Sequence, residues 1–260
     1  MELNRFSRTE LLIGDKGLST LADKHTMVCG IGGVGSYAAE ALGRAGVGKI
    51  TLVDFDDICI SNINRQIHAL SSTIGRSKVG IMSERLLDIN PNASIVAIKE
   101  FFSQSNAERI LTPKPDFVLD AIDNFTAKVS LITICREHGI PIISSMGAAN
   151  KLDPTKIEVS DISQTKNCRM ARSMRRILKK NGITSGVQVV YSTEIHRDLA
   201  LLDTHEESAG SATSNHVKQA SVNHEQKVIL GSISYIPSIT GLTMAGVVIN
   251  ELLKNSRCTK

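Results

Sequence analysis

A glycine-rich turn between an apolar run and a helix-like segment limits what this chain can fold into more than any other feature. The apolar run is Met27–Cys29, and the helix-like segment covers residues 36–46. The glycines of the turn are Gly30, Gly32, Gly33 and Gly35. Such glycines let the backbone turn tightly and approach a phosphate, and the N-terminus of the following helix presents unpaired N–H groups and a partial positive charge. The pattern therefore predicts a phosphate-binding turn.

An acidic residue downstream of the turn extends the pattern. A second apolar run, residues 49–53, ends at Asp54. A carboxylate in this place can bind the hydroxyl groups of a ribose. Strand, glycine turn, helix, strand and acid, in that order, favour a nucleotide site over an ordinary glycine turn. The motif alone does not say which nucleotide is bound.

Apolar runs alternate with helix-like segments along most of the chain. We expect strands at residues 27–31, 49–53, 94–98, 117–121 and 140–144. We expect helices at residues 36–46, 76–89, 104–111, 124–138, 168–180 and 239–254. This alternation predicts an α/β fold of the doubly wound, Rossmann-like kind, with a mostly parallel sheet and helices on both faces. In such sheets the ligand lies beyond the carboxyl ends of the strands.

The length of 260 residues suits one large α/β domain with small additions. We expect residues 1–165 to form an N-terminal arm and the nucleotide-binding domain. Residues 166–260 then complete the same domain as a C-terminal extension with a basic helix, a mobile loop and a final strand and helix. The mobile loop is expected at about 200–227, where polar residues dominate, and the strand at 228–235.

An uncharged stretch near the C-terminus, residues 228–250, is long enough to raise the alternative of a membrane-spanning helix. Gly231, Pro237 and Gly241 interrupt it, and a buried helix over residues 238–254 is the better explanation. We expect no stable membrane insertion, while peripheral association with a membrane stays open.

Charge and cysteine content add weaker constraints. The formal net charge of +4 permits a polyanionic partner without requiring one. The five cysteines are scattered, without a C-x-x-C pair, and no signal peptide precedes the first strand. This pattern predicts reduced thiols in a cytoplasmic protein and gives no support to a structural zinc site.

Two cations and an acid after Asp54 bear on the choice of nucleotide. ATP carries about four negative charges and an attacking carboxylate adds another, so a site that brings them together needs fixed cations. Arg65 and Lys78 can neutralise the phosphates, and Asp123 can hold Mg²⁺ between them. Each residue alone is better explained as part of a surface salt bridge. Taken as an ordered set they favour ATP over a nicotinamide cofactor.

At this point the chain resembles the family of E1-like adenylating enzymes, which includes the activators of ubiquitin-like sulfur carriers. The resemblance covers roughly residues 5–160. It rests on Gly30-x-Gly-Gly-Val-Gly35, Asp54-x-Asp56, Ser61-Asn62-x-Asn64-Arg65-Gln66, Gly75-x-x-Lys78, Asn90-Pro91 and Asp120-x-x-Asp123-Asn124. It implies that ATP and Mg²⁺ are the cofactors. It further implies that the nucleotide is bound by Gly30, Gly32, Gly33, Gly35, Asp54, Asp56, Asn62, Arg65, Gln66, Lys78, Asp123 and Asn124.

The resemblance also assigns roles within this set. Arg65 and Lys78 are implied to bind the phosphates, and Asp123 to bind Mg²⁺. The segment around Arg8 is similar to the family's N-terminal arginine segment, in which an arginine reaches into the partner subunit's ATP site. A homodimer, with Arg8 as a catalytic residue beside Arg65, Lys78 and Asp123, is therefore implied.

Within the family, the chain is most similar to the branch that dehydrates N6-threonylcarbamoyladenosine at position 37 of tRNA. Segments 64–70, 153–157 and 191–194 carry this similarity, and the zinc cysteines of other branches are missing. The similarity implies that a threonine carboxylate attacks the α-phosphate of ATP, after which the adenylate cyclises and AMP leaves. The alternative is adenylation of the C-terminus of a sulfur-carrier protein. A sulfur-relay protein stays open as a second partner.

The segment of residues 166–180 carries seven cations and no acid. At helical spacing one face holds Arg169, Arg172, Arg176 and Lys179, and another holds Met170, Met174 and Ile177. This predicts a helix that packs by its apolar stripe and binds RNA phosphates with its basic face, although a solvated charged face is the alternative. Cys168, at the start of this helix, is expected to be structural rather than catalytic.

Overall fold

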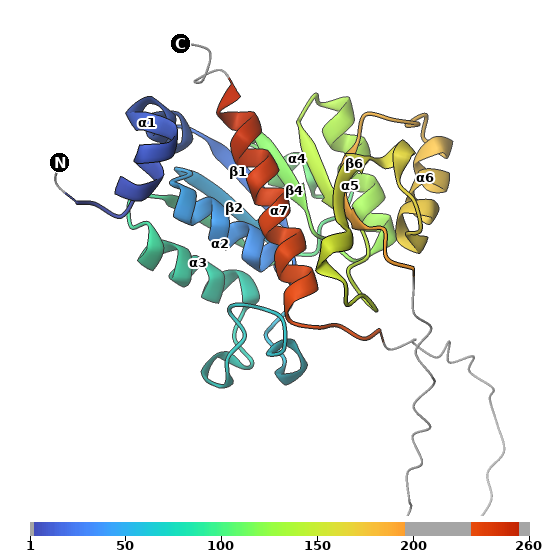
Figure 1. Ribbon diagram of the computed structural model, residues 1–260, viewed down its shortest axis with the longest axis horizontal. Helices are drawn as coiled ribbons and strands as arrows, with labels where there is room; N and C mark the ends of the chain where they lie inside the picture. The colour runs from blue at the N-terminus through green and yellow to red at the C-terminus, as the bar shows by residue number, and fades with distance from the viewer. Residues whose placement is uncertain (1–2, 196–229, 255–260) are drawn as a thin grey trace, which may run out of the picture.

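The computed structural model describes residues 3–195 and 230–254 (Figure 1). Its centre is a seven-stranded sheet in the order β3-β2-β1-β4-β5-β7-β6. The strands are β1 (His25–Cys29), β2 (Lys49–Val53), β3 (Ser94–Ile98), β4 (Phe117–Asp120), β5 (Ile142–Ser145), β6 (Ile157–Asp161) and β7 (Gln188–Ser192). Every neighbouring pair is parallel except β6 and β7, which run antiparallel at one edge. The doubly wound α/β fold is therefore confirmed.

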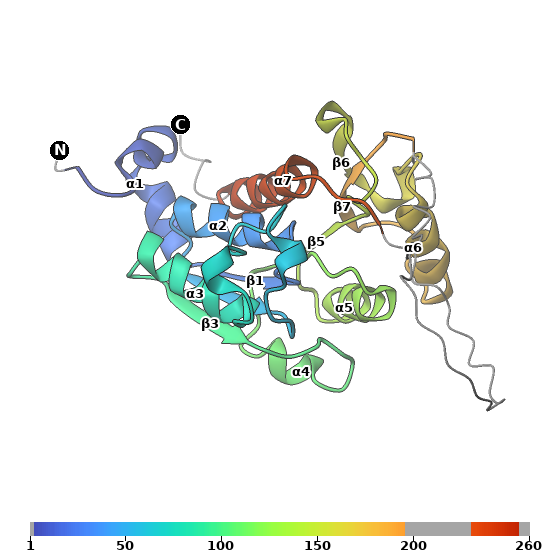
Figure 2. The ribbon, with the colours of Figure 1, turned by 90° about the horizontal axis from the view of Figure 1, so that it is seen from below.

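Helices cover both faces of this sheet (Figure 2). The α-helices are α1 (Ser7–Ala22), α2 (Gly35–Ala45), α3 (Lys78–Ile89), α4 (Ala107–Ile110), α5 (Phe125–Glu137), α6 (Arg169–Lys180) and α7 (Tyr235–Leu252). Single 3₁₀ turns are η1 (Ile60–Asn62), η2 (Ser71–Thr73), η3 (Pro154–Lys156) and η4 (Ile162–Gln164). Helices α1, α2, α3 and α7 share one hydrophobic cluster, and α4, α5 and α6 share the other.

The two clusters meet at the central strands. In β1, Met27 and Cys29 belong to the cluster on the α5 face, while Val28 belongs to the cluster on the α2 face. All five residues of β1 are buried, because successive side chains of a strand point to opposite faces and both faces are covered. This burial explains why the inner strands are almost continuously apolar.

Each expected helix, and each strand expected before residue 145, overlaps an observed one, and two features differ. The antiparallel pair β6 and β7, whose strands are separated in the chain by α6, was not expected. The strand expected at 228–235 is wrong in its described part, because residues 230–234 form no strand and α7 already begins at Tyr235. Pro237 lies in the first turn of α7, where a missing N–H leaves no intrahelical bond unmade. The loop expected at about 200–227 lies outside the described residues.

Helix α7 crosses α2 closely. Gly241 packs so tightly on α2 that an added Cβ would collide with the carbonyl oxygen of Val34. Ile236, Met244, Ala245 and Val248 are buried on the same side. The apolar C-terminal stretch thus fills the core of the sheet's α2 face. Among the described helices, none is long and apolar enough to cross a membrane.

Candidate nucleotide-binding site

The glycine turn joins β1 to α2 and packs against the end of β4. Gly30 has a φ of 87°, and a Cβ there would lie 2.6 Å from the carbonyl oxygen of Ala121. Gly35, the first residue of α2, sits so close to the Gly30 carbonyl that any side chain would collide with it. No side chain caps the N-terminus of α2. Its backbone donors can therefore face an anion, as the sequence predicts.

Asp54 follows β2 and lies directly beside the turn. Its Oδ2 accepts a hydrogen bond from the Ile31 backbone N–H at 2.6 Å, and its Oδ1 accepts one from the Asp56 N–H at 2.8 Å. Burial raises the pKa of Asp54, while these two bonds and nearby Lys78 act in the opposite direction. The carboxylate is held in one orientation next to Gly30–Ile31, where a ribose hydroxyl could donate to its remaining lone pairs.

Lys78 is the first residue of α3 and is nearly buried. Its side chain is 7% exposed, and its Nζ pairs with Oδ2 of Asp56 at 2.6 Å. Its backbone N–H donates to the Asp56 carbonyl oxygen at 3.1 Å, so the segment after β2 fixes both ends of this lysine. Asp56 thus orients a cation toward the carboxyl end of β2, two residues from Asp54.

Arg65 lies on the connection between β2 and α3 and crosses over the turn. A Cβ on Gly33 would be 3.2 Å from Cγ of Arg65. The Arg65 Nη1 donates to the Ser61 carbonyl oxygen at 2.9 Å and to Oδ1 of Asn64 at 2.8 Å. These acceptors are neutral, and no ion pair with Arg65 occurs among the described residues. Its charge therefore stays available to a phosphate.

Two amide side chains support the same connection. Asn62 is buried, and its Oδ1 accepts the Cys59 backbone N–H at 3.1 Å, which closes the turn before Arg65. Gln66 is also buried, and its Oε1 has no partner among the described residues. The Gln66 Nε2 lies 3.9 Å from the position of a Cβ on Gly32. An unpaired buried amide beside the glycine turn fits a polar ligand there.

Asp123 and Asn124 follow β4 on the other side of the turn. Asn124 caps α5, since its Oδ1 accepts the Ala127 N–H at 3.0 Å. Asp123 is exposed, with no hydrogen bond or ion pair to its carboxylate among the described residues. The described residues contain no cluster of three metal-binding side chains. One free carboxylate fits Mg²⁺ that arrives with a triphosphate, because Mg²⁺ often takes one or two carboxylates plus substrate phosphates.

A buried ion pair lies beneath this part of the site, and we did not expect it. Lys128 and Asp120 are both fully buried, with Nζ and Oδ2 2.8 Å apart. The signal available from sequence is Asp120 at the end of an apolar strand, since a buried carboxylate needs a partner. Nothing in the spacing names Lys128 as that partner, because a lysine on an amphipathic helix is usually exposed.

Two groups of predicted residues lie away from the nucleotide ligands. Phe6 contacts Gly46, the residue after α2, and the Arg5 Nη1 donates to the carbonyl oxygen of Ile89 at the end of α3. These contacts place α1 with Arg8 at the far end of α2, about 16 Å from the phosphate turn at 1.5 Å rise per residue. Arg8 is exposed and is not brought to the site of its own chain.

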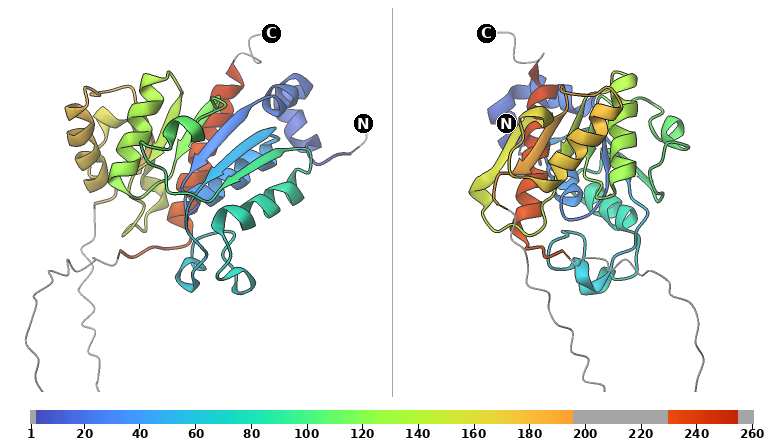
Figure 3. Two further views of the ribbon diagram at one scale, coloured as in Figure 1. Left: turned by 180° about the vertical axis from the view of Figure 1, so that it is seen from behind. Right: turned by 90° about the vertical axis from the view of Figure 1, so that its right-hand side faces the viewer.

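Helix α6 lies beside α5, at the end of the molecule opposite α1 (Figure 3). Its exposed residues include the four predicted RNA ligands, Arg169, Arg172, Arg176 and Lys179. Its buried stripe is Ala171, Met174 and Leu178, so Met174 is buried as expected, while Ala171 and Leu178 replace the expected Met170 and Ile177. Arg175 is turned inward, and its Nη1 donates to the Thr165 carbonyl oxygen at 3.0 Å. Cys168 is buried at the N-cap, where its Sγ accepts the Ala171 N–H at 3.5 Å, which fits a structural role.

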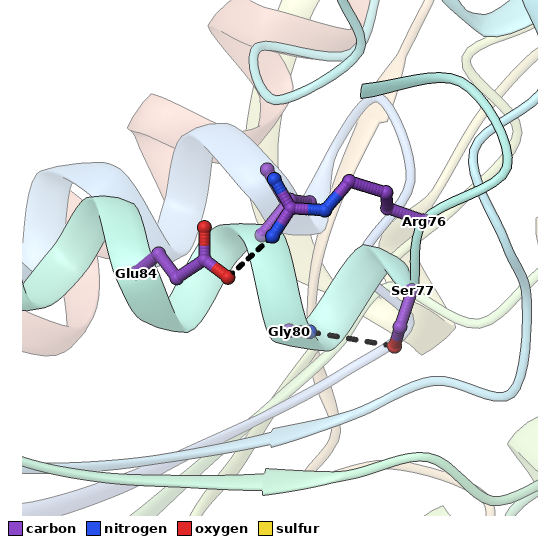
Figure 4. Close-up of a pocket in the computed structure, with 5 residues that line it drawn as sticks. Arg76, Ser77, Gly80 and Glu84 are labelled. Atoms are coloured by element: carbon purple, nitrogen blue, oxygen red, sulfur yellow. Dashed lines mark hydrogen bonds and ion pairs between the residues drawn. The ribbon is translucent and has the colours of Figure 1, made fainter. Parts of the chain in front are cut away.

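A separate surface hollow of about 370 Å³ lies at the start of α3 (Figure 4). Its lining residues are Arg76, Ser77, Gly80, Ile81 and Glu84. Arg76 and Glu84 form an ion pair across it at 2.6 Å. None of the predicted nucleotide ligands lines the hollow, so we do not assign it to the nucleotide.

The arrangement of glycine turn, ribose acid and two cations can be compared with known proteins. The model of the ThiF family matches residues 6–259 of this chain. The chain belongs to this family. It is 43% identical, over 97% of its length and 96% of the relative's, to the tRNA threonylcarbamoyladenosine dehydratase of Bacillus subtilis. It is 30% identical, over 70% of its length and 72% of the relative's, to the molybdopterin-synthase adenylyltransferase of Escherichia coli.

Solved structures agree with this assignment to the family. The E. coli tRNA N6-threonylcarbamoyladenosine dehydratase in complex with AMP superposes with a TM-score of 0.83 at 33% identity, covering 97% of this chain and 95% of that one. The same enzyme in complex with ATP superposes with a TM-score of 0.81 at 32% identity, covering 98% and 96%. The Rossmann-like fold and the family predicted from sequence are thus confirmed.

Proposed function

We propose that this protein catalyses the ATP-dependent dehydration of N6-threonylcarbamoyladenosine in tRNA to its cyclic form. The observation that carries the proposal is the likeness to the B. subtilis dehydratase over nearly the whole of both chains. The binding of ATP and AMP by the E. coli enzyme of the same fold supports ATP as the co-substrate. The glycine turn, Asp54, Arg65 and Lys78 supply the contacts that such a nucleotide needs.

The first step joins the threonine carboxylate to the α-phosphate of ATP, and pyrophosphate leaves. Arg65 and Lys78 reduce the repulsion between the carboxylate and the triphosphate, and Asp56 keeps Lys78 in place. The glycine turn and the N-terminus of α2 bind phosphate oxygens, and Asp54 binds the ribose. Mg²⁺ bound by Asp123 would supply further charge neutralisation to the phosphates.

The second step closes a ring within the substrate. The carbamoyl group attacks the activated carbonyl carbon, the bond to AMP breaks, and the result is loss of one water from the original nucleoside. Because both groups belong to the same nucleoside, holding them in contact provides a high effective concentration without a protein nucleophile. Buried Cys168 is therefore not required.

The test is mass spectrometry of nucleosides from tRNA that carries the threonylcarbamoyl group, after incubation with ATP and the protein. We expect the modified adenosine to lose the mass of one water, with AMP and pyrophosphate released. An unchanged nucleoside, together with pyrophosphate exchange that depends on a small carrier protein, would instead support the alternative activity. The lower identity to the molybdopterin-synthase adenylyltransferase makes that alternative the second choice.

For tRNA we propose that the exposed face of α6 binds phosphates. Four exposed cations of one helix form this face, and each phosphate contact contributes to the salt dependence of RNA binding. Replacing Arg172 and Arg176 with glutamine should weaken tRNA binding and lower the slope of log K against log salt by about two. Lys16 on α1 and Lys114 in the loop before β4 are exposed, and glutamine at both positions makes a control of equal charge change. Equal slopes in the two double variants would refute this role of α6.

We further propose a homodimer in which Arg8 serves the ATP site of the partner subunit. Arg8 is at the wrong end of α2 to reach the site of its own chain. The adjoining residues Leu11 and Leu12 are 68% and 87% exposed, which is unusual for leucine unless another surface covers it. A second copy that packs on the first half of α1 would bury both leucines and carry Arg8 with them.

A further inference from the structure

A fully buried ammonium group lies below the loop that follows β4. Lys128 Nζ donates to Oδ2 of Asp120 at 2.8 Å, to Oγ of Ser144 at 3.1 Å and to the Ser145 carbonyl oxygen at 2.9 Å. The Ser144 hydroxyl in turn donates to Oδ2 of Asp120 at 2.6 Å. Three acceptors satisfy all three N–H bonds of the ammonium group. The network joins α5, β4 and β5 at the carboxyl ends of the two strands.

A gain in stability does not by itself explain this buried ion pair. Burying two charges costs desolvation that their attraction only offsets when the geometry is good, and an apolar pair of similar volume is often equally stable. Because the Lys128–Asp120 pair lies at the edge of the candidate ATP site, a role in that site explains it better than a role in stability. Asp120 is the last residue of β4, directly before the loop that contains Asp123.

The second oxygen of Asp120 reaches this loop. Asp120 Oδ1 accepts the backbone N–H of Ile122 at 3.1 Å, which bends the chain immediately after β4. The bend places the Ala121 carbonyl oxygen against Gly30, so the β4 loop and the phosphate turn are in contact. One carboxylate thus connects the buried ammonium group on one side with the loop to Asp123 on the other.

We infer that Lys128 is a positioning residue for the adenylation step, acting through Asp120 on the loop 121–124. The inference rests on the proposed function, since it takes Asp123 to act on the phosphates. Lys128 holds the Asp120 carboxylate in the one rotamer that bonds to Ile122. It also neutralises a carboxylate that would otherwise face a triphosphate across a poorly solvated layer.

The experiment uses the hydroxyl of Ser144, because Lys128→Met leaves a buried carboxylate unpaired and threatens the fold. Ser144→Ala removes one partner of both charged groups and keeps the ion pair. We expect a folded protein whose dissociation constant for ATP, measured by calorimetry, stays within about threefold of wild type. We expect its kcat for pyrophosphate exchange to fall about tenfold with an unchanged KM for ATP.

A matched control removes a buried hydroxyl from another strand, away from the β4 and β5 ends. His25 Nε2, at the amino end of β1, and Thr51 Oγ1, in the middle of β2, are 2.9 Å apart. Thr51→Val deletes this bond and should lower thermal stability without changing kcat. An equal loss of kcat in Thr51→Val and Ser144→Ala would overturn the inference, because any buried polar deletion would then have the same effect.

A double-mutant cycle separates this inference from the proposed function. If Ser144 and Lys128 act through the loop, Ser144→Ala should lower the exchange rate of Asp123→Asn by no more than about twofold, since the two effects are not additive. A further tenfold loss in the double variant would overturn the inference while leaving the role of Asp123 intact. Normal exchange by Asp123→Asn alone would instead remove the role of Asp123 in the proposed function.

Discussion

The two phosphate cations are held in different ways, and this difference determines what each can do. Lys78 is nearly buried and shares its charge with Asp56 at 2.6 Å. Arg65 bonds only neutral oxygens in the described part of the chain, so nothing there offsets its charge. We infer that Lys78 shapes the site before the nucleotide binds, whereas Arg65 is the cation whose charge is directed to the ligand.

Arg65→Ala should slow adenylation by about 10²–10³-fold, the usual loss when one preorganised charge or donor at a reacting oxygen is removed. The measurement is the rate of pyrophosphate exchange at saturating ATP. Arg76→Ala provides the control, because Arg76 pairs with Glu84 beside the hollow of Figure 4 and lines no part of the nucleotide site. Activity of Arg65→Ala within a few-fold of Arg76→Ala would show that the assignment of Arg65 is wrong.

His68 predicts a pH dependence of stability. It is 1% exposed, both ring nitrogens lack partners among the described residues, and burial lowers its pKa to about 4. The folded state keeps the ring neutral, while the unfolded state gains a proton below about pH 6.5. The stabilisation is therefore complete above pH 6.5 and is lost as the pH falls toward 4, by up to about 3 kcal/mol.

The measurement is the free energy of unfolding in denaturant between pH 7 and pH 4. His68→Leu removes the titrating ring and should flatten this part of the curve. His25, whose pKa burial also lowers, is present in both proteins and cancels in the comparison. Parallel curves for the wild type and His68→Leu would show that the ring is not held neutral in the fold.

The candidate site was predictable from sequence where a residue lies in a local pattern. The glycine turn and Asp54 follow from the strand–turn–helix order, and the structure brings them together through the bond from Ile31 to Asp54. Lys128 was not predictable, because its role depends on Ser144 and Asp120, which meet it only in the folded sheet. Long-range contacts of this kind have no periodic signal.

Helices and strands, like single residues, were predictable where the signal is local and were missed where it is not. The buried strands β1, β2, β4 and β5 were found because burial on both faces leaves apolar runs. The edge pair β6 and β7 was missed although β7 is largely buried, because β6 has no buried residue and carries Glu158 and Asp161. The C-terminal apolar stretch was divided wrongly at Pro237, since periodicity cannot separate a short buried strand from the first turn of a buried helix.

The contact of α7 with α2 predicts a difference between two glycines of one helix. Gly241→Ala would drive a methyl group into the Val34 carbonyl at the start of the phosphate helix, and should destabilise the fold by about 1–3 kcal/mol. Gly246 meets nothing within 4 Å, so Gly246→Ala should be neutral or stabilise by up to about 1 kcal/mol. Thermal unfolding measures both. Equal effects would mean that α7 does not approach α2 this closely.

At the scale of the whole molecule, the ATP site and the N-terminal segment lie at opposite ends of α2. The segments that follow β1, β2 and β4, up to the start of the next helix, supply every nucleotide ligand that the structure brings together. The exposed Leu11 and Leu12 lie on α1, beyond the other end of these strands (Figure 1). In a single chain, therefore, Arg8 does not reach the ATP site. This is the arrangement expected if Arg8 of each copy completes the ATP site of the other copy.

Mixing two inactive variants tests this arrangement. If Arg8 acts in the partner's site, Arg8→Ala and Arg65→Ala homodimers each carry two defective sites. A mixed dimer places both defects in one site and leaves the other intact, so equal mixtures that exchange subunits should recover about a quarter of wild-type activity, the share expected for half of the dimers with one good site each. If Arg8 acted within its own chain, every site of the mixture would lack one arginine. Pyrophosphate exchange no higher in the mixture than in the separate variants would therefore exclude the shared site.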